Sequence, residues 1–197
     1  DVYKRQDHYY IVPDIMTLAK GIASSYIPFG AVAVSAEINA PFESGETHFI
    51  HGFTNGGHPL GCAAGSELID IIRDENLLEN CRKQSEVLFS YREQLLAHPT
   101  VRDVRGWGLM MVLELIKDKE SLDFFDSSLQ AEKLYSAITL KHGLVMYGSL
   151  YGPRRQAAFK RGLPSWISPP LTISGEEMHD LVGRLDNALS EWESIVL

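Results

Sequence analysis

The sequence has few cysteines, no excess of basic residues and no long apolar run, and each shortage excludes a class of protein. Two of its 197 residues are cysteines, Cys62 and Cys81, which is too few for a disulfide-stapled secreted fold and favours reduced thiols. A formal net charge of −8 leaves no basic excess to neutralise phosphates, so we expect no nucleic-acid partner and no membrane partner. No stretch predicts a transmembrane helix or a signal peptide, and we expect a cytoplasmic protein.

The histidines do not form a metal-binding pattern either. His48, His51 and His58 lie near one another in the sequence, but their spacing matches no standard zinc motif. No cysteine or carboxylate nearby completes a ligand set. The sequence therefore predicts no metal site.

What the sequence does contain is an alternation of strand-like and helical patterns, which indicates an α/β fold. The apolar run from Phe29 to Val34 predicts a strand covered on both faces. Residues 36–57 are rich in glycine and contain Pro41, so they are predicted to be loop. From 59 to 98 the periodicity predicts one long helix carrying both cysteines, with a bend or break at 74–78 because Asn76 is a poor helix former.

The second half of the chain predicts a small domain of strands and helices. Its last helix is opened by a capping box from Ser174 to Glu177 and carries Met178, Leu181, Leu185, Leu189 and Trp192 on one face. The remaining elements are expected to be paired strands over 101–116, a helix over 129–142 ending at Gly143, and short strands at 144–147 and 166–168.

Lys20 stands out because it ends a strand-like run that begins at Asp14 and is followed at once by Gly21. An ammonium group buried without a partner is costly, so a lysine in such a run snorkels, pairs, or gives up its charge and becomes a nucleophilic amine. A neutral lysine amine can form a Schiff base with an aldehyde cofactor. The alternative is a surface lysine at the start of a loop, which is where most lysines lie.

Three segments in series resemble one enzyme family. They are the Lys20-Gly21 pair, the Thr-x-x-Gly-x-Pro segment of residues 54–59, and the Arg-Gly-x-Gly-Leu segment of residues 105–109. In this order and at these intervals they resemble the class III pyridoxal-phosphate aminotransferases, which include the ω-aminotransferases. The resemblance covers residues 7–197 and less than half of a typical member. The family's phosphate-binding glycine-serine turn, stacking aromatic and ring-nitrogen aspartate precede the lysine and are absent here, so we expect the back half of an enzyme.

The resemblance implies the C-terminal portion of a fold type I pyridoxal-phosphate-dependent transferase. Residues 7–58 are then the C-terminal end of the large cofactor-binding domain, 59–98 an interdomain helix region, and 99–197 a small α/β domain. Residues 1–6 are interpreted as a non-native leader, because they match the translation of a transposase end sequence used in sequencing libraries.

The resemblance also implies site residues. Lys20 would hold pyridoxal phosphate as a Schiff base and, once displaced by the incoming amine, would move a proton between substrate and cofactor. Thr54 would bind the cofactor phosphate, typically across a dimer interface, which implies a homodimer; the alternative is that residues 54–59 only make a tight turn before a helix. Arg154 and Arg155 are candidates for binding a substrate carboxylate, the alternative being solvated surface arginines.

The implied function is transfer of an amino group from an amine or ω-amino acid to an oxo acid such as pyruvate. An aminomutase, a racemase or a decarboxylase of the same fold would share Lys20 and remains an alternative. The further alternative is that the chain as written is an inactive truncated fragment, and we expect the isolated chain to be inactive.

Overall fold

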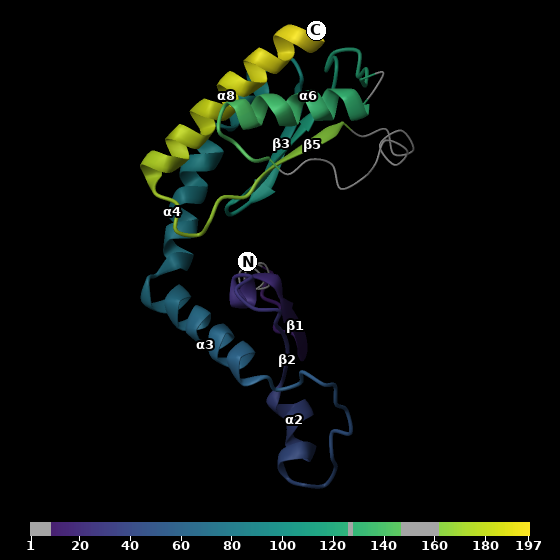
Figure 1. Ribbon diagram of the computed structural model, residues 1–197, viewed down its shortest axis with the longest axis vertical. Helices are drawn as coiled ribbons and strands as arrows, with labels where there is room; N and C mark the ends of the chain where they lie inside the picture. The colour runs from purple at the N-terminus through teal and green to yellow at the C-terminus, as the bar shows by residue number, and fades with distance from the viewer. Residues whose placement is uncertain (1–8, 126–127, 147–161) are drawn as a thin grey trace. The chain divides into compact units, whose positions relative to one another are not determined.

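The computed structural model describes residues 9–125, 128–146 and 162–197 (Figure 1). The chain divides into two compact units, the first ending at Leu77 and the second beginning at Leu78. This division falls inside the predicted interdomain helix region, while the predicted leader lies outside the described residues. None of the helices in the described ranges is long and apolar enough to cross a bilayer.

The first unit contains a two-stranded antiparallel hairpin. Strand β1 (Ile15–Ala19) pairs with β2 (Gly30–Val34) in a register that places Ala19 opposite Gly30. The predicted strand near residue 30 is therefore confirmed, but the expectation that it is covered on both faces is wrong. Most residues of β2 are exposed, because β1 is its only partner strand among the described residues and no described helix makes extensive contact with β2.

Helix α2 (Ala36–Glu43) occupies the first part of the segment predicted to be loop, so that prediction is wrong there. Ser35 caps the helix by accepting a hydrogen bond from the Ile38 amide at 3.4 Å. Asn39 donates to the Glu43 carboxylate one turn later, at 2.6 Å. These local hydrogen bonds compensate for the backbone hydrogen bond that Pro41, which has no N–H, cannot donate.

The predicted long helix is divided into α3 (Pro59–Asp74), α4 (Leu77–Ser90) and α5 (Arg92–Ala97). The break falls where it was predicted, since Asn76 has a φ of 53° and the left-handed region cannot continue an α-helix. Cys62 and Cys81 consequently lie on different helices, and their placement on one helix is a prediction that the structure corrects.

The second unit is built on a three-stranded antiparallel sheet in the order β3-β4-β5. Strands β3 (Val101–Trp107) and β4 (Met110–Leu115) form the predicted hairpin, and β5 (Leu163–Ile167) pairs with β4. Gly106 is required in the hairpin, because a Cβ there would lie 2.0 Å from the carbonyl oxygen of Met110.

Helices α6 (Ser128–Lys141) and α8 (Gly175–Val196) pack against each other over the sheet (Figure 1). The side chains in the core formed by these helices and the sheet are almost completely buried. Its members include Leu88, Leu95, Val101, Met111, Leu113, Leu115, Met178, Leu185, Leu189 and Trp192.

The ends of these two helices follow the sequence closely. The capping box is confirmed: the Ser174 hydroxyl accepts from the Glu177 amide at 3.2 Å, and the Glu177 carboxylate accepts from the Ser174 amide at 2.8 Å. Gly143 ends α6 with a φ of 79°, as predicted. The strand predicted to follow is absent from residues 144–146, because the Leu144 amide donates to the Thr139 carbonyl and so completes the helix end.

Candidate active site

Lys20 lies at the junction between β1 and the short 3-10 helix η1 (Lys20–Ala23). Its φ of 55° is in the left-handed region, which costs a residue with a Cβ about 1–2 kcal/mol. The side chain is exposed, so the burial argument made from the sequence does not hold in this chain. The strained backbone is what distinguishes this lysine in the structure, since such strain tends to persist at functional positions.

Helix α3 holds the segment that follows Lys20. Ala23, at the end of η1, is buried to 2% exposure, and η1 packs against α3. The ring of Phe29 lies against the first two turns of α3, over Gly61 and Gly65. The strand ends next to Lys20 are therefore tied to α3 by a small set of contacts.

A cavity of about 300 Å³ opens beside these contacts, at the lower end of the size range of ligand pockets. Neither Lys20 nor Thr54 lines it. Thr54 lies between two lining residues, Phe53 and Asn55, and the lining residue Gly30 pairs with Ala19, which precedes Lys20. The lining residues are Ile27, Pro28, Phe29 and Gly30 from one segment and Phe53, Asn55, Gly57 and His58 from another.

The second of these segments is the turn that leads into α3. The Gly56 amide donates to the Phe53 carbonyl at 3.0 Å, Gly57 has a φ of 65°, and Pro59 is the first helical residue. A tight turn before the helix is therefore present, as one reading of the sequence expected. The side chain of His58 does not cap the helix, so the partial positive charge at the start of α3 is not met by a capping side chain.

A series of ring contacts connects the side chains of the segment that precedes this turn. Phe49 meets Phe42 edge-on at a centroid distance of 6.0 Å and His51 at 5.7 Å, and His51 lies 6.0 Å from Phe53. All four rings are exposed. This series brings Phe53 to the cavity wall.

Sequence reasoning named Lys20 and Thr54 but missed Phe29 and His58 as cavity residues. One signal was available: Gly61 and Gly65 are four residues apart, a spacing that places both on one helical face and leaves room for a large side chain. Arg154 and Arg155, the candidates for a substrate carboxylate, lie outside the described residues.

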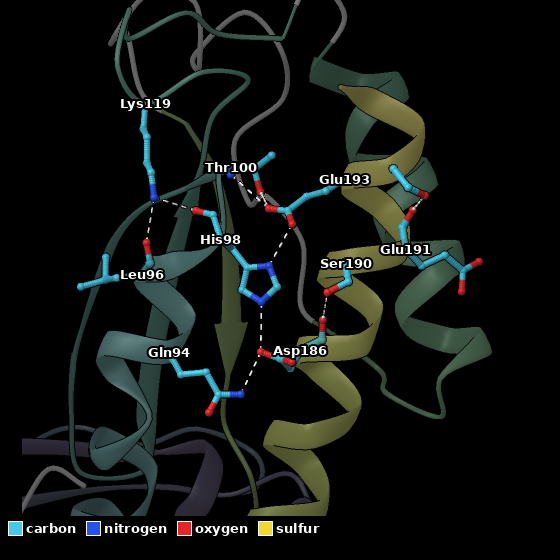
Figure 2. A network of polar contacts seen from close by, with 10 residues as sticks. Gln94, Leu96, His98, Thr100, Lys119, Asp186, Ser190, Glu191 and Glu193 are labelled. Atoms are coloured by element: carbon cyan, nitrogen blue, oxygen red, sulfur yellow. Dashed lines mark hydrogen bonds and ion pairs between the residues drawn. The ribbon is translucent and has the colours of Figure 1, made fainter.

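A second group of polar residues lies in the other unit and surrounds His98 (Figure 2). The ring nitrogens of His98 lie 2.9 Å from a Glu193 oxygen and 3.1 Å from an Asp186 oxygen. The hydrogen bond to Glu193 raises the pKa of His98 against the effect of burial, and Asp186 adds to the rise.

Glu193 is held by further donors. Burial opposes its ionisation, but hydrogen bonds from His98 and from the amide and hydroxyl of Thr100, at 3.1 and 2.6 Å, outweigh that effect and lower its pKa. Both oxygens of the Glu193 carboxylate accept hydrogen bonds. Glu193, His98 and Thr100 thereby join α8 to the segment between α5 and β3 and serve as a structural clamp. In the described parts of the chain, no group of histidine, cysteine, aspartate or glutamate is arranged to hold a metal ion.

Comparisons with known proteins agree on one family. The model of the class III aminotransferases matches residues 5–189. The chain is 35% identical to an aminotransferase of Gibberella zeae over 91% of this chain and 35% of that protein, and 33% identical to the putrescine–pyruvate aminotransferase of Pseudomonas aeruginosa over 96% of this chain and 39% of that protein. A solved (S)-enantioselective omega-transaminase from Thermomicrobium roseum is 35% identical, with a TM-score of 0.79, over 95% of this chain and 39% of that structure.

The chain thus spans between about a third and two fifths of the length of these relatives. The solved relatives are transaminases, which as a class depend on pyridoxal phosphate, and the matched region includes both the Lys20 junction and the turn into α3. On the extent of the family match, this chain belongs to the class III aminotransferases.

Proposed function

We propose that this chain is part of a pyridoxal-phosphate-dependent transaminase that moves an amino group from an amine or ω-amino acid to an oxo acid such as pyruvate. The observation that carries the proposal is the position of Lys20. It is the lysine that matches the family motif, and it is held in a strained backbone conformation one residue beyond Ala19, whose strand partner Gly30 lines the cavity.

The residues present fit the cofactor. The turn into α3 offers the Asn55 amide, the His58 ring and the uncapped start of a 16-residue helix, all suited to a phosphate group. Phe29 and Phe53 supply apolar walls in the same cavity. Polar donors and aromatic side chains on one cavity are chemically suited to an anionic ligand with a flat ring.

When bound, pyridoxal phosphate supplies the aldehyde that a lysine amine can bond and the electron sink for the reaction. In the proposed mechanism the Lys20 amine would hold the cofactor. The same amine, when it is free, would accept and return the proton at the substrate carbon that bears nitrogen. Thr54 would donate its hydroxyl to the phosphate of the cofactor in a second copy of the chain, and Arg154 and Arg155 remain the proposed donors to a substrate carboxylate.

The wider setting is also a proposal. Thr54 lies on an exposed turn, so its hydroxyl is free to serve the site of a second copy, and we propose a homodimer on that basis. A cytoplasmic location is proposed from the reduced-thiol composition. We further propose that residues 7–58 belong to the large domain and 99–197 to the small one, with 59–98 between them.

The test is covalent capture of the cofactor. Pyridoxal phosphate is added to the longest coding sequence that contains this chain, and to the 197-residue chain alone, and the bond is reduced with borohydride. Peptide mass spectrometry should find the reduced cofactor on Lys20 and on no other lysine, and Lys20→Ala should abolish it. A well-folded longer protein that gives no adduct at Lys20 would refute the proposal.

A half-reaction separates the transaminase from its alternatives. The loaded protein is given an amine donor without any oxo acid, and the cofactor absorbance is followed. A transaminase converts the cofactor to its amine form in one turnover and stops, whereas an aminomutase, racemase or decarboxylase returns the aldehyde form. Retention of the aldehyde spectrum with all of several amines would favour those alternatives.

A further inference from the structure

Both ring nitrogens of His98 face carboxylate oxygens. Nδ1 lies 2.9 Å from a Glu193 oxygen, and Nε2 lies 3.1 Å from an Asp186 oxygen (Figure 2). An ionised carboxylate can only accept hydrogen bonds, and a neutral imidazole has a single N–H to donate. Both contacts are therefore hydrogen bonds only when the ring carries two protons and a positive charge.

The charges around the ring favour this protonated form. The charged groups that face His98 are Asp186 and Glu193 on α8 and Lys119 from the segment after β4. The Lys119 ammonium is held by the carbonyl oxygens of Leu96 and His98, at 2.8 and 2.9 Å. The hydrogen bond to Glu193 outweighs the burial of the ring, and together with the Asp186 contact it raises the pKa of His98.

The two carboxylates differ in how firmly they are held. The Glu193 side chain is 9% exposed, and its second oxygen accepts from the amide and the hydroxyl of Thr100 at 3.1 and 2.6 Å. The Asp186 side chain is 32% exposed, and the oxygen that meets His98 also accepts from Gln94 at 2.9 Å. Glu193 cannot turn away without leaving buried donors unpaired, whereas Asp186 can turn towards water.

A neutral His98 ring must give up one of its two hydrogen bonds. The nitrogen that loses its proton presents a lone pair to a carboxylate oxygen, and that contact becomes repulsive. Opening the contact with Glu193 would disturb the buried bonds to Thr100, whereas the groups released by opening the contact with Asp186 can be solvated. The remaining proton therefore stays on Nδ1, and the Asp186 contact opens.

We propose that His98 is a proton-dependent latch between α5 and α8. In its charged form the ring holds Asp186 and Glu193 against the end of α5. In its neutral form it keeps Glu193 and releases Asp186, and the bond from Gln94 on α5 to Asp186 is lost with it. The latch lies in the second unit and does not depend on a cofactor.

The first measurement is a titration of the His98 ring in the 197-residue chain. Proton–nitrogen correlation spectra of the imidazole distinguish the charged ring from each neutral tautomer, and the ring signals are assigned through the backbone. The range runs from about pH 5 to about pH 10 and includes the ordinary pKa of histidine. Both nitrogens should carry protons at low pH, and in the neutral form the proton should be on Nδ1.

The second measurement is hydrogen exchange of the backbone amides over the same range, corrected for the intrinsic exchange rate at each pH. The amides of residues 95–98 should lose protection as His98 loses its proton. The expected loss is on the order of tenfold, the effect of removing one hydrogen bond to a charged group. The Thr100 amide, which stays bonded to Glu193, should keep its protection.

Asp186→Asn separates the latch from a general effect of pH. An asparagine amide can accept from a protonated Nε2 and donate to a bare one, so this contact with His98 should survive the titration. Protection of residues 95–98 should then no longer follow the charge of the ring. Asp180→Asn is the matched control on the same helix, because its carboxylate pairs with Arg184, and it should keep the profile of the parent.

A neutral ring with its proton on Nε2 would overturn the inference, as would a ring whose charge does not change over the range. Unchanged protection of residues 95–98 in the parent, or an equal loss in Asp186→Asn, would also overturn it. If Asp186→Asn does not fold, the tautomer and the exchange profile of the parent decide. None of these results depends on capture of pyridoxal phosphate, so a failure of the proposed function leaves the test intact.

Discussion

Replacing Glu193 with alanine should destabilise the second unit more than any other single loss of charge on α8. Glu193 is 7% exposed, and its carboxylate accepts three hydrogen bonds: two come from Thr100 and one from the His98 ring. Removing it leaves the Thr100 amide and hydroxyl, which are fully buried, without their acceptor. Truncating one member of such a buried charged group costs about 3–5 kcal/mol.

The assay is urea unfolding followed by tryptophan fluorescence, which reports on the second unit because all three tryptophans lie between residues 78 and 197. Glu191→Ala is the matched control two residues away on the same helix. Its carboxylate pairs with Lys141 and His142 at a partly exposed position, so we expect a clearly smaller loss of stability than for Glu193→Ala. Equal losses for the two variants would refute the view that the clamp around His98 stabilises the unit.

Other predictions concern the same unit. The pKa of His98 in the folded state is raised above 6.5, so the stability that its charged form contributes is complete below pH 6.5 and is lost as the pH rises through the raised pKa. The pKa of Glu193 is lowered from 4.5, so the stability that its carboxylate contributes is lost as the pH falls through the lowered pKa. Urea midpoints from pH 4 to 9 should therefore fall on both sides, and His98→Gln should flatten the alkaline side. Asn80→Ala removes donors to the Leu171 and Ile173 carbonyls, at 2.7 and 3.0 Å, and should cost about 1–3 kcal/mol in the same assay. Ser174→Ala should cost about 1 kcal/mol, and a loss that Glu177 variants reproduce would identify the capping box as the cause.

Local signals in the sequence were sufficient for much of the second unit. The glycines of residues 101–116 predict the hairpin there, and Ser174 and Glu177 predict the start of α8. Asn76 predicts the break between the helices. Each of these depends on residues close together in the chain. Short-range rules therefore predicted them.

The errors arose where distant or competing contacts decide the structure. Helix α2 forms because Ser35 and Asn39 outweigh Pro41, a balance that composition does not reveal. The candidate site depends on the ring of Phe29 reaching a helix more than 30 residues further along the chain, and sequence spacing predicts that glycines leave room without saying what fills it. Lys20 was identified by family resemblance, while its strained backbone became visible only in the structure.

The left-handed backbone at Lys20 makes lysine, which the proposed chemistry needs, an unfavourable residue for the stability of the fold at that position. Glycine or asparagine would adopt the same conformation at lower cost, so either substitution should make the hairpin more stable while removing the amine. A laboratory selection that rewarded heat resistance alone would therefore favour variants that have lost this lysine. Improving such a protein for industrial use would require activity to be scored in every round.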